Sequence, residues 1–240
     1  MKKISTAIIP LAGKGSRAHP YSHFQPKALF CVAGTPILKR TSDIAVNDIG
    51  VTKVVLVTGY LESQIFGFIE ANNHLWPNIV FEFVNCPDPS VGLAKGLFLT
   101  KSLVAQDSHF VCLLGDEFYL DSNHNELQTF FETHPSTQCL IFGKTPSNSY
   151  EVSKNYSVET TEFNKLKLIE KPSKVPPQAL IGLGTYVFGQ RIFHAIETTP
   201  PSQRSGKVEL TDCIQSLIDD DEPVSVLKYL GEYININTRD

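Results

Sequence analysis

Apolar runs and segments of helical spacing alternate along the first half of the chain. Five runs rich in β-branched and aromatic residues have the composition of buried strands, and they cover residues 7–12, 53–60, 78–84, 109–115 and 137–143. Between them, apolar residues recur at the spacing of one helix face in residues 61–71, 92–104 and 126–134. This alternation predicts a parallel sheet with right-handed crossover connections.

One predicted helix has boundary signals at both ends. Thr35 can cap it, Pro36 suits its first position, and Gly50 is expected to end it. The apolar residues from Ile37 to Ile49 recur on one face of such a helix. The pattern therefore predicts one continuous helix between these two signals.

Strands follow one another more closely in the second half of the chain. The predicted strands cover residues 156–160, 166–172 and 180–188, followed by helices over 189–199 and 208–220 and two further strands within 224–236. The two halves together predict an α/β fold: a doubly wound, mostly parallel mixed sheet of Rossmann-like type with a smaller, partly antiparallel lobe. The Pro-rich segment 171–178 is too short to separate independent domains, so a single domain over residues 1–240 is expected.

Charge and hydropathy exclude several functional classes. A net charge of −4 argues against a protein built to bind nucleic acid or an anionic membrane surface. No apolar run approaches the ~20 residues that cross a bilayer, and the first residues have the pattern of a strand rather than of a signal peptide.

The five cysteines are scattered and form no C-x-x-C pair. Three of them, Cys31, Cys112 and Cys139, lie in strongly apolar stretches, whereas Cys86 and Cys213 do not. Buried free thiols are typical of a reducing compartment, so a cytoplasmic protein is expected.

A glycine loop follows the first predicted strand. Residues 11–30, "LAGKGSRAHPYSHFQPKALF", contain Gly13-x-Gly15-x-x-Ala18, which partly matches the dinucleotide-binding fingerprint. That fingerprint should open into a long helix, yet Pro20 and Pro26 lie where the helix would run. No G-x-x-x-x-G-K-[ST] spacing exists either, so both the dinucleotide loop and the Walker phosphate loop are disfavoured.

Two cations lie on this proline-stiffened segment. The glycines allow backbone N–H groups to close around phosphate oxygens, and Arg17 and Lys27 can then meet the charge that develops in phosphoryl transfer. A surface turn with two solvated cations is the alternative for a bare glycine loop.

The extended stretch 11–38, "LAGKGSRAHPYSHFQPKALFCVAGTPIL", resembles the signature of the sugar-phosphate nucleotidyltransferases. That signature is a strand, then A-G-x-G-[TS]-R, a proline, P-K-x-L and G-x-P-[IML]. The resemblance continues in order through "GLAKGLFLT", "LLGDEFY", "LIEKP", "GLGTYVF", "VELTDCIQSLI" and "GEYININT". It implies a nucleotidyltransferase fold, in which residues 1–145 mainly bind the nucleotide and residues 146–240 mainly form the acceptor-binding lobe and complete the sheet.

The resemblance also implies an activity and its site residues. The implied reaction condenses a nucleoside triphosphate with a sugar 1-phosphate, giving a nucleotide-sugar and pyrophosphate, with Mg²⁺ as cofactor. The implied catalytic residues are Arg17 and Lys27, and the metal positions are Asp116 and Asn235. The implied nucleotide-binding residues are Leu11, Ala12, Gly13, Lys14, Gly15, Ser16, Asn85 and Gly92. The implied acceptor-binding residues are Glu170, Lys171, Gly184 and Tyr186.

The chain departs from the family pattern at three positions. Asn235 stands where the pattern has a second metal-binding aspartate, Tyr233 where it has a tryptophan, and Ser157 where it has a glycine. An amide oxygen is a weaker ligand for Mg²⁺ than a carboxylate. Three alternatives stay open: a cytidylyltransferase acting on phosphocholine or another small phosphate ester, which the stretch "PKALFCVAGTPIL" also fits, a weakly active nucleotide-binding regulatory homologue, which Asn235 suggests, and a dehydrogenase. The base, the acceptor and a homo-oligomeric state are also left open.

Overall fold

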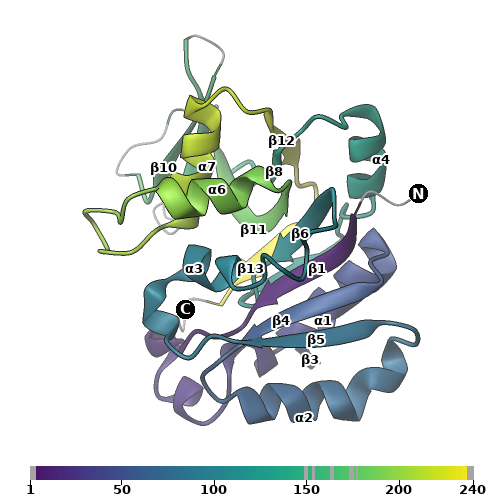
Figure 1. The fold of residues 1–240 in the computed structure, drawn as a ribbon. Coiled ribbons are helices and arrows are strands. Elements are labelled where there is room, and N and C mark those ends of the chain that lie inside the picture. Colours follow the sequence, from purple (N-terminus) through teal and green to yellow (C-terminus); the bar gives the residue numbers. More distant parts are fainter. Residues whose placement is uncertain are drawn as a thin grey trace.

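The computed structural model describes residues 4–148, 151–152, 155–162, 165–172, 176 and 178–236. Its centre is a nine-stranded mixed sheet with the strand order β10-β9-β11-β6-β1-β4-β5, while β8 pairs with β11 and β12 with β8. Helices lie on both faces of this sheet (Figure 1), as the sequence pattern predicts. None of the helices described is long and apolar enough to span a bilayer.

The N-terminal half of the sheet is parallel. Its strands are β1 (Ile4–Pro10), β4 (Lys53–Thr58), β5 (Val80–Asn85) and β6 (His109–Leu113). In this half, β1 pairs with β4 and β6, and β4 pairs with β5, all in parallel. The carboxyl ends of these four strands therefore meet at one edge of the sheet, where ligands bind in open α/β folds.

The C-terminal half is arranged around one long strand. Its strands are β8 (Cys139–Lys144), β9 (Tyr156–Thr160), β10 (Leu166–Glu170), β11 (Leu180–Phe188) and β12 (Val224–Lys228). Strand β11 pairs with β8 along one side. On its other side it pairs with β9 through residues 180–182 and with β6 through residues 185–188, antiparallel in each case. The sheet therefore forks at residues 183–184, between β9 and β6.

Two buried clusters fill the two sides of the sheet. In β4, Val54 and Leu56 belong to one cluster, whereas Val55 and Val57 belong to the other, because successive side chains of a strand point to opposite faces. The first cluster includes side chains of α1 (Ile37–Asp43), α2 (Glu62–Asn72) and α4 (Glu126–Thr133). The second includes side chains of α3 (Leu93–Phe98), α6 (Arg191–Thr198) and α7 (Leu210–Asp219).

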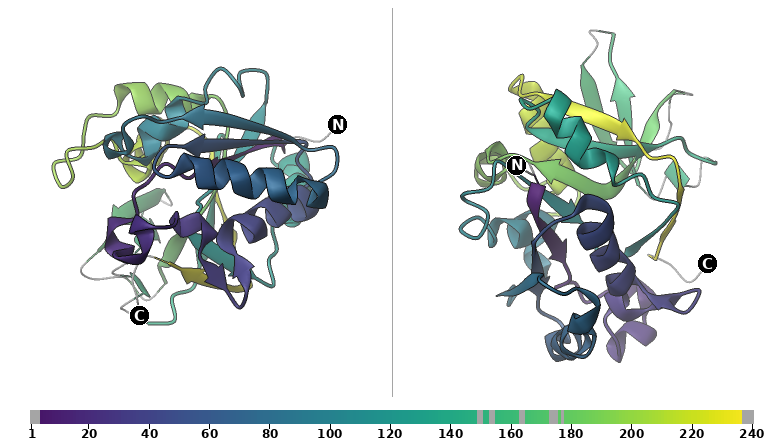
Figure 2. Two further views of the ribbon diagram at one scale, coloured as in Figure 1. Left: turned by 90° about the horizontal axis from the view of Figure 1, so that it is seen from below. Right: turned by 90° about the vertical axis from the view of Figure 1, so that its right-hand side faces the viewer.

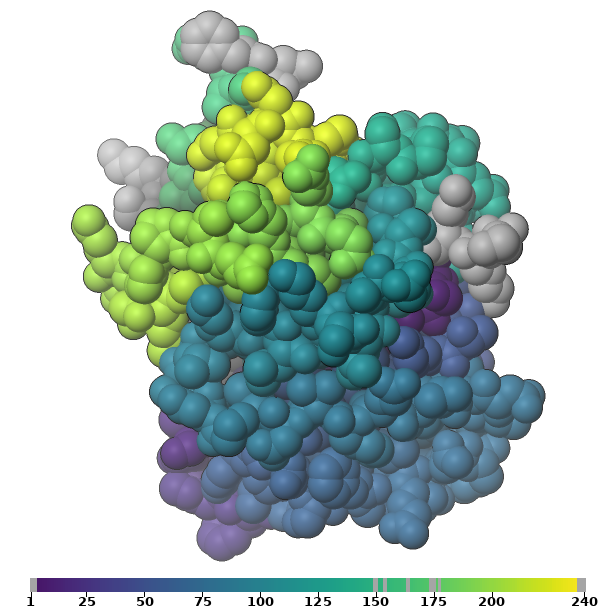
Figure 3. Space-filling model, in the orientation of Figure 1, coloured from purple at the N-terminus to yellow at the C-terminus, as the bar shows by residue number. Residues whose placement is uncertain are grey.

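These layers bring the two halves of the chain together. Figure 2 shows that the purple and blue N-terminal segments and the green and yellow C-terminal segments form adjoining parts of one body. On the face shown in Figure 3, the green surface of α6 lies directly above the teal surface of α3, which it contacts. Both halves contribute strands to the central sheet.

The structure corrects several sequence-based predictions. Thr35 does not cap a helix, because it pairs with Val32 in the short ribbon of β2 (Cys31–Val32) and β3 (Thr35–Pro36). The helix that follows is α-helical only over Ile37–Asp43 and continues as a π-helix over Ile44–Ile49, ending at Gly50 as predicted. Only residues 93–98 of the predicted helix 92–104 are helical, and turns follow.

The cysteine predictions are also only partly confirmed. Cys31 is exposed rather than buried, because it lies in the β2–β3 ribbon outside the core. Cys112 and Cys139 are buried in the central strands as predicted, and Cys86 and Cys213 are buried as well. All five are free thiols, and burial raises the pKa of Cys112 to about 12.

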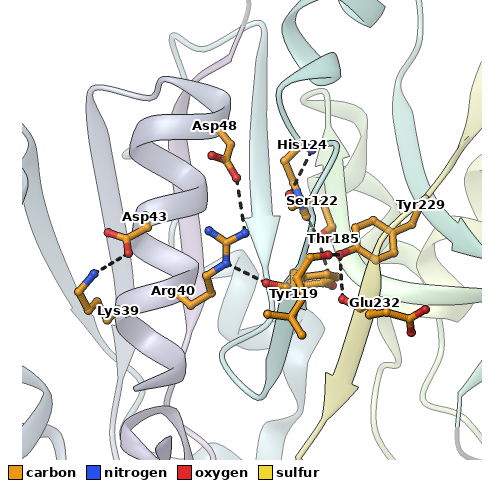
Figure 4. A network of polar contacts seen from close by, with 11 residues as sticks. Lys39, Arg40, Asp43, Asp48, Tyr119, Ser122, His124, Thr185, Tyr229 and Glu232 are labelled. Carbon is orange, nitrogen blue, oxygen red and sulfur yellow. Dashed lines mark hydrogen bonds and ion pairs between the residues drawn. The ribbon is translucent and has the colours of Figure 1, made fainter. Parts of the chain in front are cut away.

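A second two-stranded ribbon was not predicted as a unit. It pairs β7 (Glu117–Leu120) with β13 (Glu232–Asn235) in antiparallel register, so the last described strand lies against the strand that follows β6. A network of polar contacts, shown in Figure 4, supports this ribbon. Arg40 Nε donates to the Tyr119 carbonyl oxygen at 2.8 Å, and the Thr185 hydroxyl donates to the Tyr119 hydroxyl at 3.2 Å.

His124 completes that network as a buried neutral base. Its Nε2 lies 2.9 Å from Thr185 Oγ1, and its Nδ1 is hydrogen-bonded to Ser122 Oγ. Because the Thr185 hydroxyl donates elsewhere, its oxygen accepts the proton on Nε2. Burial, assisted by the positive charge of Arg40, lowers the pKa of His124 to about 3.

Acid should therefore weaken the fold through His124. The pKa of His124 is lower in the folded state than the value of about 6.5 in the unfolded state, so the unfolded state takes up a proton first as the pH falls. The neutral ring therefore contributes its full stabilisation above pH 6.5, and this contribution is lost as the pH falls toward 3. In urea unfolding, we expect His124→Gln to be less stable than wild type at pH 7. Between pH 6.5 and 4.5 that difference in unfolding free energy should shrink by about 2 kcal/mol. Parallel pH dependences of the two proteins would contradict this role.

Candidate active site

The glycine loop is an irregular segment held over the end of β1. No long helix follows it: residues 16–18, 21–23 and 27–29 form separate single turns of 3-10 helix. Gly15 has a φ of 62°, and a Cβ there would lie 2.8 Å from Lys27 Cγ, so a side chain would be both strained and obstructed. The Ser22 hydroxyl donates to the Gly15 carbonyl oxygen at 2.8 Å. The prediction that the prolines prevent a dinucleotide-type helix is confirmed.

A first cavity of about 310 Å³ lies where the four parallel strands end. Residues that end or follow β1, β4, β5 and β6 line it, together with the glycine loop and the start of α3. Its lining includes Leu11, Ala12, Gly13, Arg17, Lys27, Val57, Cys86, Gly92, Leu93, Gly115 and Asp116. Apolar and backbone groups dominate, and the charged groups are two cations and one carboxylate.

A second cavity of about 230 Å³ adjoins the first, and Arg17 and Asp116 line both. It lies at the fork in the sheet, between β11, the β7–β13 ribbon and the start of α7. Its lining includes Glu117, Asn155, Tyr156, Glu170, Lys171, Gly184, Tyr186, Glu209, Thr211 and Asn235. This cavity is therefore rich in polar and ionisable side chains.

An ion pair marks the junction of the two cavities. Lys27 Nζ lies 2.8 Å from Asp116 Oδ2 and also donates to the Ile236 carbonyl oxygen at 3.1 Å. The Ile236 N–H in turn donates to the Asp116 carbonyl oxygen at 2.9 Å. Three segments far apart in the sequence thus converge there, and an ammonium group already neutralises the Asp116 carboxylate. Arg17, by contrast, is exposed and has no ion-pair partner among the described residues.

Glu117, next to this ion pair, is a fully buried carboxyl group that the sequence analysis missed. It is only 3% exposed and accepts hydrogen bonds from the Tyr119 hydroxyl, from Gly184 N–H at 2.7 Å and from Asn235 Nδ2 at 3.3 Å. Burial raises its pKa to about 7 despite these donors. The sequence signal was the pair of acids in "GDEFY", but nothing in that pattern showed that the second acid is buried.

The far end of the second cavity has another ionic cluster. Glu170 accepts a hydrogen bond from the Thr211 hydroxyl at 3.4 Å and lies 3.6 Å from Arg204, which also lies 3.7 Å from Glu209. Partial burial raises the pKa of Glu170, and Arg204 opposes that shift. Lys171, the next residue, has a φ of 47° and donates its N–H to the Asn155 carbonyl oxygen. Glu209 and Thr211 lie in the motif "VELTD" but were not predicted as site residues, and Arg204, which pairs with both acids from outside the lining, was not predicted at all.

The structure brings most of the predicted site residues together. Leu11, Ala12, Gly13 and Gly92 line the first cavity, and Glu170, Lys171, Gly184, Tyr186 and Asn235 line the second. Lys14, Gly15 and Ser16 lie in the same loop but outside both linings. Asn85 also lies outside them, because its amide donates to Glu62 Oε2 at 2.8 Å.

The junction offers a dication two side-chain ligands, Asp116 and Asn235, and a bound substrate can supply more. Among the described residues, no group of three or more His, Cys, Asp or Glu side chains is arranged to hold a metal ion. Asp116 and Asn235 line one cavity and offer a carboxylate and an amide oxygen, which suit a hard dication. Mg²⁺ is commonly bound by one or two such groups together with phosphate oxygens of a substrate. The residues present therefore fit Mg²⁺ brought in with a polyphosphate.

Comparisons with known proteins agree with this geometry. The family model described as "Nucleotidyl transferase" matches residues 6–232. The chain is 30% identical over 215 residues to the bifunctional protein GlmU of Methanococcus maripaludis, covering 89% of this chain and 47% of that protein. It is 27% identical over 232 residues to the UTP–glucose-1-phosphate uridylyltransferase AglF of Haloferax volcanii, covering 96% and 90%. The chain thus spans about half the length of the GlmU relative.

Solved structures share the fold. A UDP-glucose pyrophosphorylase complexed with UDP-glucose superimposes with a TM-score of 0.81 at 18% identity, covering 98% of this chain and 94% of that one. A UTP-bound UGPase from Acinetobacter baumannii gives a TM-score of 0.80 at 22% identity, covering 98% and 90%. At these identities the likeness establishes the fold, which is the predicted one.

Gly184 should be intolerant of any side chain. A Cβ there would lie 2.7 Å from Leu114 and 2.8 Å from Glu117 Cδ, which must both move. We expect Gly184→Ala to lower the unfolding free energy by about 1–3 kcal/mol, measured by urea unfolding. Gly67→Ala is the matched control, because nothing lies within 4 Å of its Cβ and it is in α2, where alanine should be neutral or stabilising. Equal stability of the two variants would contradict the close packing at the fork.

Proposed function

Because this chain belongs to the nucleotidyl transferase family, we propose that it transfers a nucleotidyl group from a nucleoside triphosphate to a sugar 1-phosphate. A phosphate oxygen of the sugar 1-phosphate attacks the α-phosphorus of the nucleoside triphosphate. The bond between that phosphorus and the oxygen that bridges to the β-phosphate breaks, and pyrophosphate leaves. The observation that supports this most is the pair of adjoining cavities that share Arg17 and Asp116. The nucleotide donor and the sugar 1-phosphate acceptor can then bind side by side at these two residues.

The two cavities suit different parts of the substrates. The first cavity has apolar walls, which can bind the base and ribose. Its glycine loop and two cations, Arg17 and Lys27, can bind the triphosphate. The second has carboxylate and amide groups that can hydrogen-bond to sugar hydroxyls. In this proposal residues 1–145 mainly bind the nucleotide and residues 146–240 mainly bind the acceptor.

The chemistry needs positive charge more than it needs a base. The attacking phosphate is already an anion, so the protein has to bring two polyanions together and offset the charge that develops at the α-phosphate. Arg17 is exposed at the junction and can bind the β- and γ-phosphates. Lys27 is held by Asp116 with its ammonium group in the cavity wall, and it can turn from that carboxylate to the reacting phosphates.

We extend the proposal to a magnesium ion bound by Asp116 and Asn235 together with substrate phosphates. When bound, such an ion offsets phosphate charge and orients the phosphate oxygens. Asp116 would then exchange its ammonium partner for the ion, which releases Lys27 toward the substrate.

The alternative acceptor phosphocholine is less well matched to the second cavity. A quaternary ammonium group is usually bound over aromatic faces, and the two tyrosines in this lining, Tyr156 and Tyr186, are only 5% and 4% exposed. Here Arg204 already lies within 4 Å of both Glu170 and Glu209. A neutral polyol can hydrogen-bond to this paired cluster without meeting an unfavourable charge.

Pyrophosphate release tests the proposal directly. The protein is assayed with each common nucleoside triphosphate against several sugar 1-phosphates and against phosphocholine, with and without Mg²⁺. We expect Mg²⁺-dependent turnover with at least one sugar 1-phosphate. Turnover only with phosphocholine would replace the acceptor class, and nucleotide binding without any turnover would favour a regulatory role.

The junction residues should be essential for that turnover. We expect Lys27→Ala and Asp116→Ala each to lower kcat at least a hundredfold, because each removes charge compensation at the reacting phosphates. Lys39→Ala is the matched control: Lys39 forms an ion pair of similar length, 2.7 Å, with Asp43 on α1, outside both cavity linings. Near-normal turnover of either junction variant would refute the assignment.

A further inference from the structure

The antiparallel ribbon places Glu117 directly opposite Asn235. In the register of β7 and β13, Asn235 pairs with Glu117, Ile234 with Phe118 and Tyr233 with Tyr119. Side chains directly opposite one another in such a pair are neighbours, and like charges there are destabilising. Glu117 and Asn235 also line the same cavity as Asp116.

The environment of Glu117 leaves this carboxyl group little freedom. Its Oε2 accepts from Gly184 N–H at 2.7 Å and from the Tyr119 hydroxyl, and the whole residue is only 3% exposed. Its Oε1 accepts from Asn235 Nδ2 at 3.3 Å. Tyr119 is itself fixed, because it accepts a hydrogen bond from Thr185 and contacts Tyr229 and Tyr233 edge-on or tilted. The carboxylate is thus a rigid acceptor facing the amide.

We infer that Glu117 is a positioning residue that orients the Asn235 amide for cation binding. Glu117 Oε1 accepts a hydrogen bond from the NH₂ end of the amide, and this contact orients the Asn235 side chain. The carbonyl oxygen is then the end of the amide that does not face Glu117, and Asn235 and Asp116 line the same cavity. Glu117 also places a second carboxyl group in the lining of the cavity that holds Asp116 and Asn235.

The same contact disfavours an aspartate at position 235. An aspartate there would place a second carboxylate against a buried one at about the distance of the present hydrogen bond, 3.3 Å. Two carboxylates at such a distance in a buried place repel strongly. Asparagine at 235 and glutamate at 117 therefore form one unit, with the amide on β13 and the acid opposite it on β7.

This inference rests on the proposed function, because it concerns the cation of that same site, but its test uses unfolding and metal binding rather than turnover. The variants are Asn235→Asp, Glu117→Gln and the double variant, which exchanges acid and amide across the ribbon. Thermal unfolding without metal gives the midpoint Tm of each variant. The Kd for Mn²⁺ is measured by titrating the protein with Mn²⁺ alone and recording the signal of the free ion by electron paramagnetic resonance.

Three results are expected. Asn235→Asp lowers Tm by about 5 °C without metal, because of the opposed carboxylates, and Mn²⁺ raises its Tm more than that of wild type. Glu117→Gln weakens Mn²⁺ binding about tenfold, the usual effect of losing a group that orients a metal ligand. The double variant regains the wild-type Tm within about 2 °C and binds Mn²⁺ at least as tightly as wild type.

A remote asparagine provides the matched control. Asn123 is also buried and its Nδ2 donates to Glu126 Oε2 at 3.2 Å, but neither residue lines the two cavities. Asn123→Asp should lower Tm and leave the Kd for Mn²⁺ unchanged. The inference is overturned if Glu117→Gln binds Mn²⁺ like wild type, if Asn235→Asp unfolds at the wild-type Tm, or if the double variant recovers neither property. Absence of turnover in wild type would instead refute the proposed function.

Discussion

The candidate site depends on the way strand β11 is shared between two neighbours. One segment of β11 pairs with β9 and the next with β6, and the chain passes from one partner to the other at residues 183–184. At that point Gly184 N–H has no strand partner and donates to Glu117 instead. A buried carboxyl group thus ties the fork to the β7–β13 ribbon, and the second cavity lies where these elements meet. The absence of a Cβ at Gly184 is what allows this contact.

A second feature of the candidate site is the pairing of its charged side chains. The chain gathers cations from the glycine loop, acids from the ends of β6 and β10, and an arginine from the segment before α7. Lys27 with Asp116, and Arg204 with Glu170 and Glu209, are paired in the structure. Such pairs lower the cost of holding charges in a partly buried place. In the function proposed above, substrate groups of the appropriate charge would replace one partner of each pair.

The features of the fold and of the candidate site that were predictable are those that local sequence patterns specify. The parallel strands, the glycine loop without its helix, and the convergence of Lys27 and Asp116 followed from strand–helix alternation, prolines and motif resemblance. Thr35 was misassigned because a capping preference is local, whereas its pairing with Val32 depends on a ribbon between short strands. Cys31 was misassigned for a related reason: an apolar neighbourhood in sequence does not establish burial in space.

The sequence by itself determined the α/β class and the edge of the sheet at which the glycine loop lies, because these depend on periodicity and on residue types at short spacing. Its motifs indicated the nucleotidyltransferase family by resemblance. Only the tertiary structure decided that Glu117 is buried, that it faces Asn235 and that Arg204 pairs with Glu170. These contacts join residues more than 30 positions apart in sequence. Their existence depends on strand register and on the fork in β11, which no local pattern specifies.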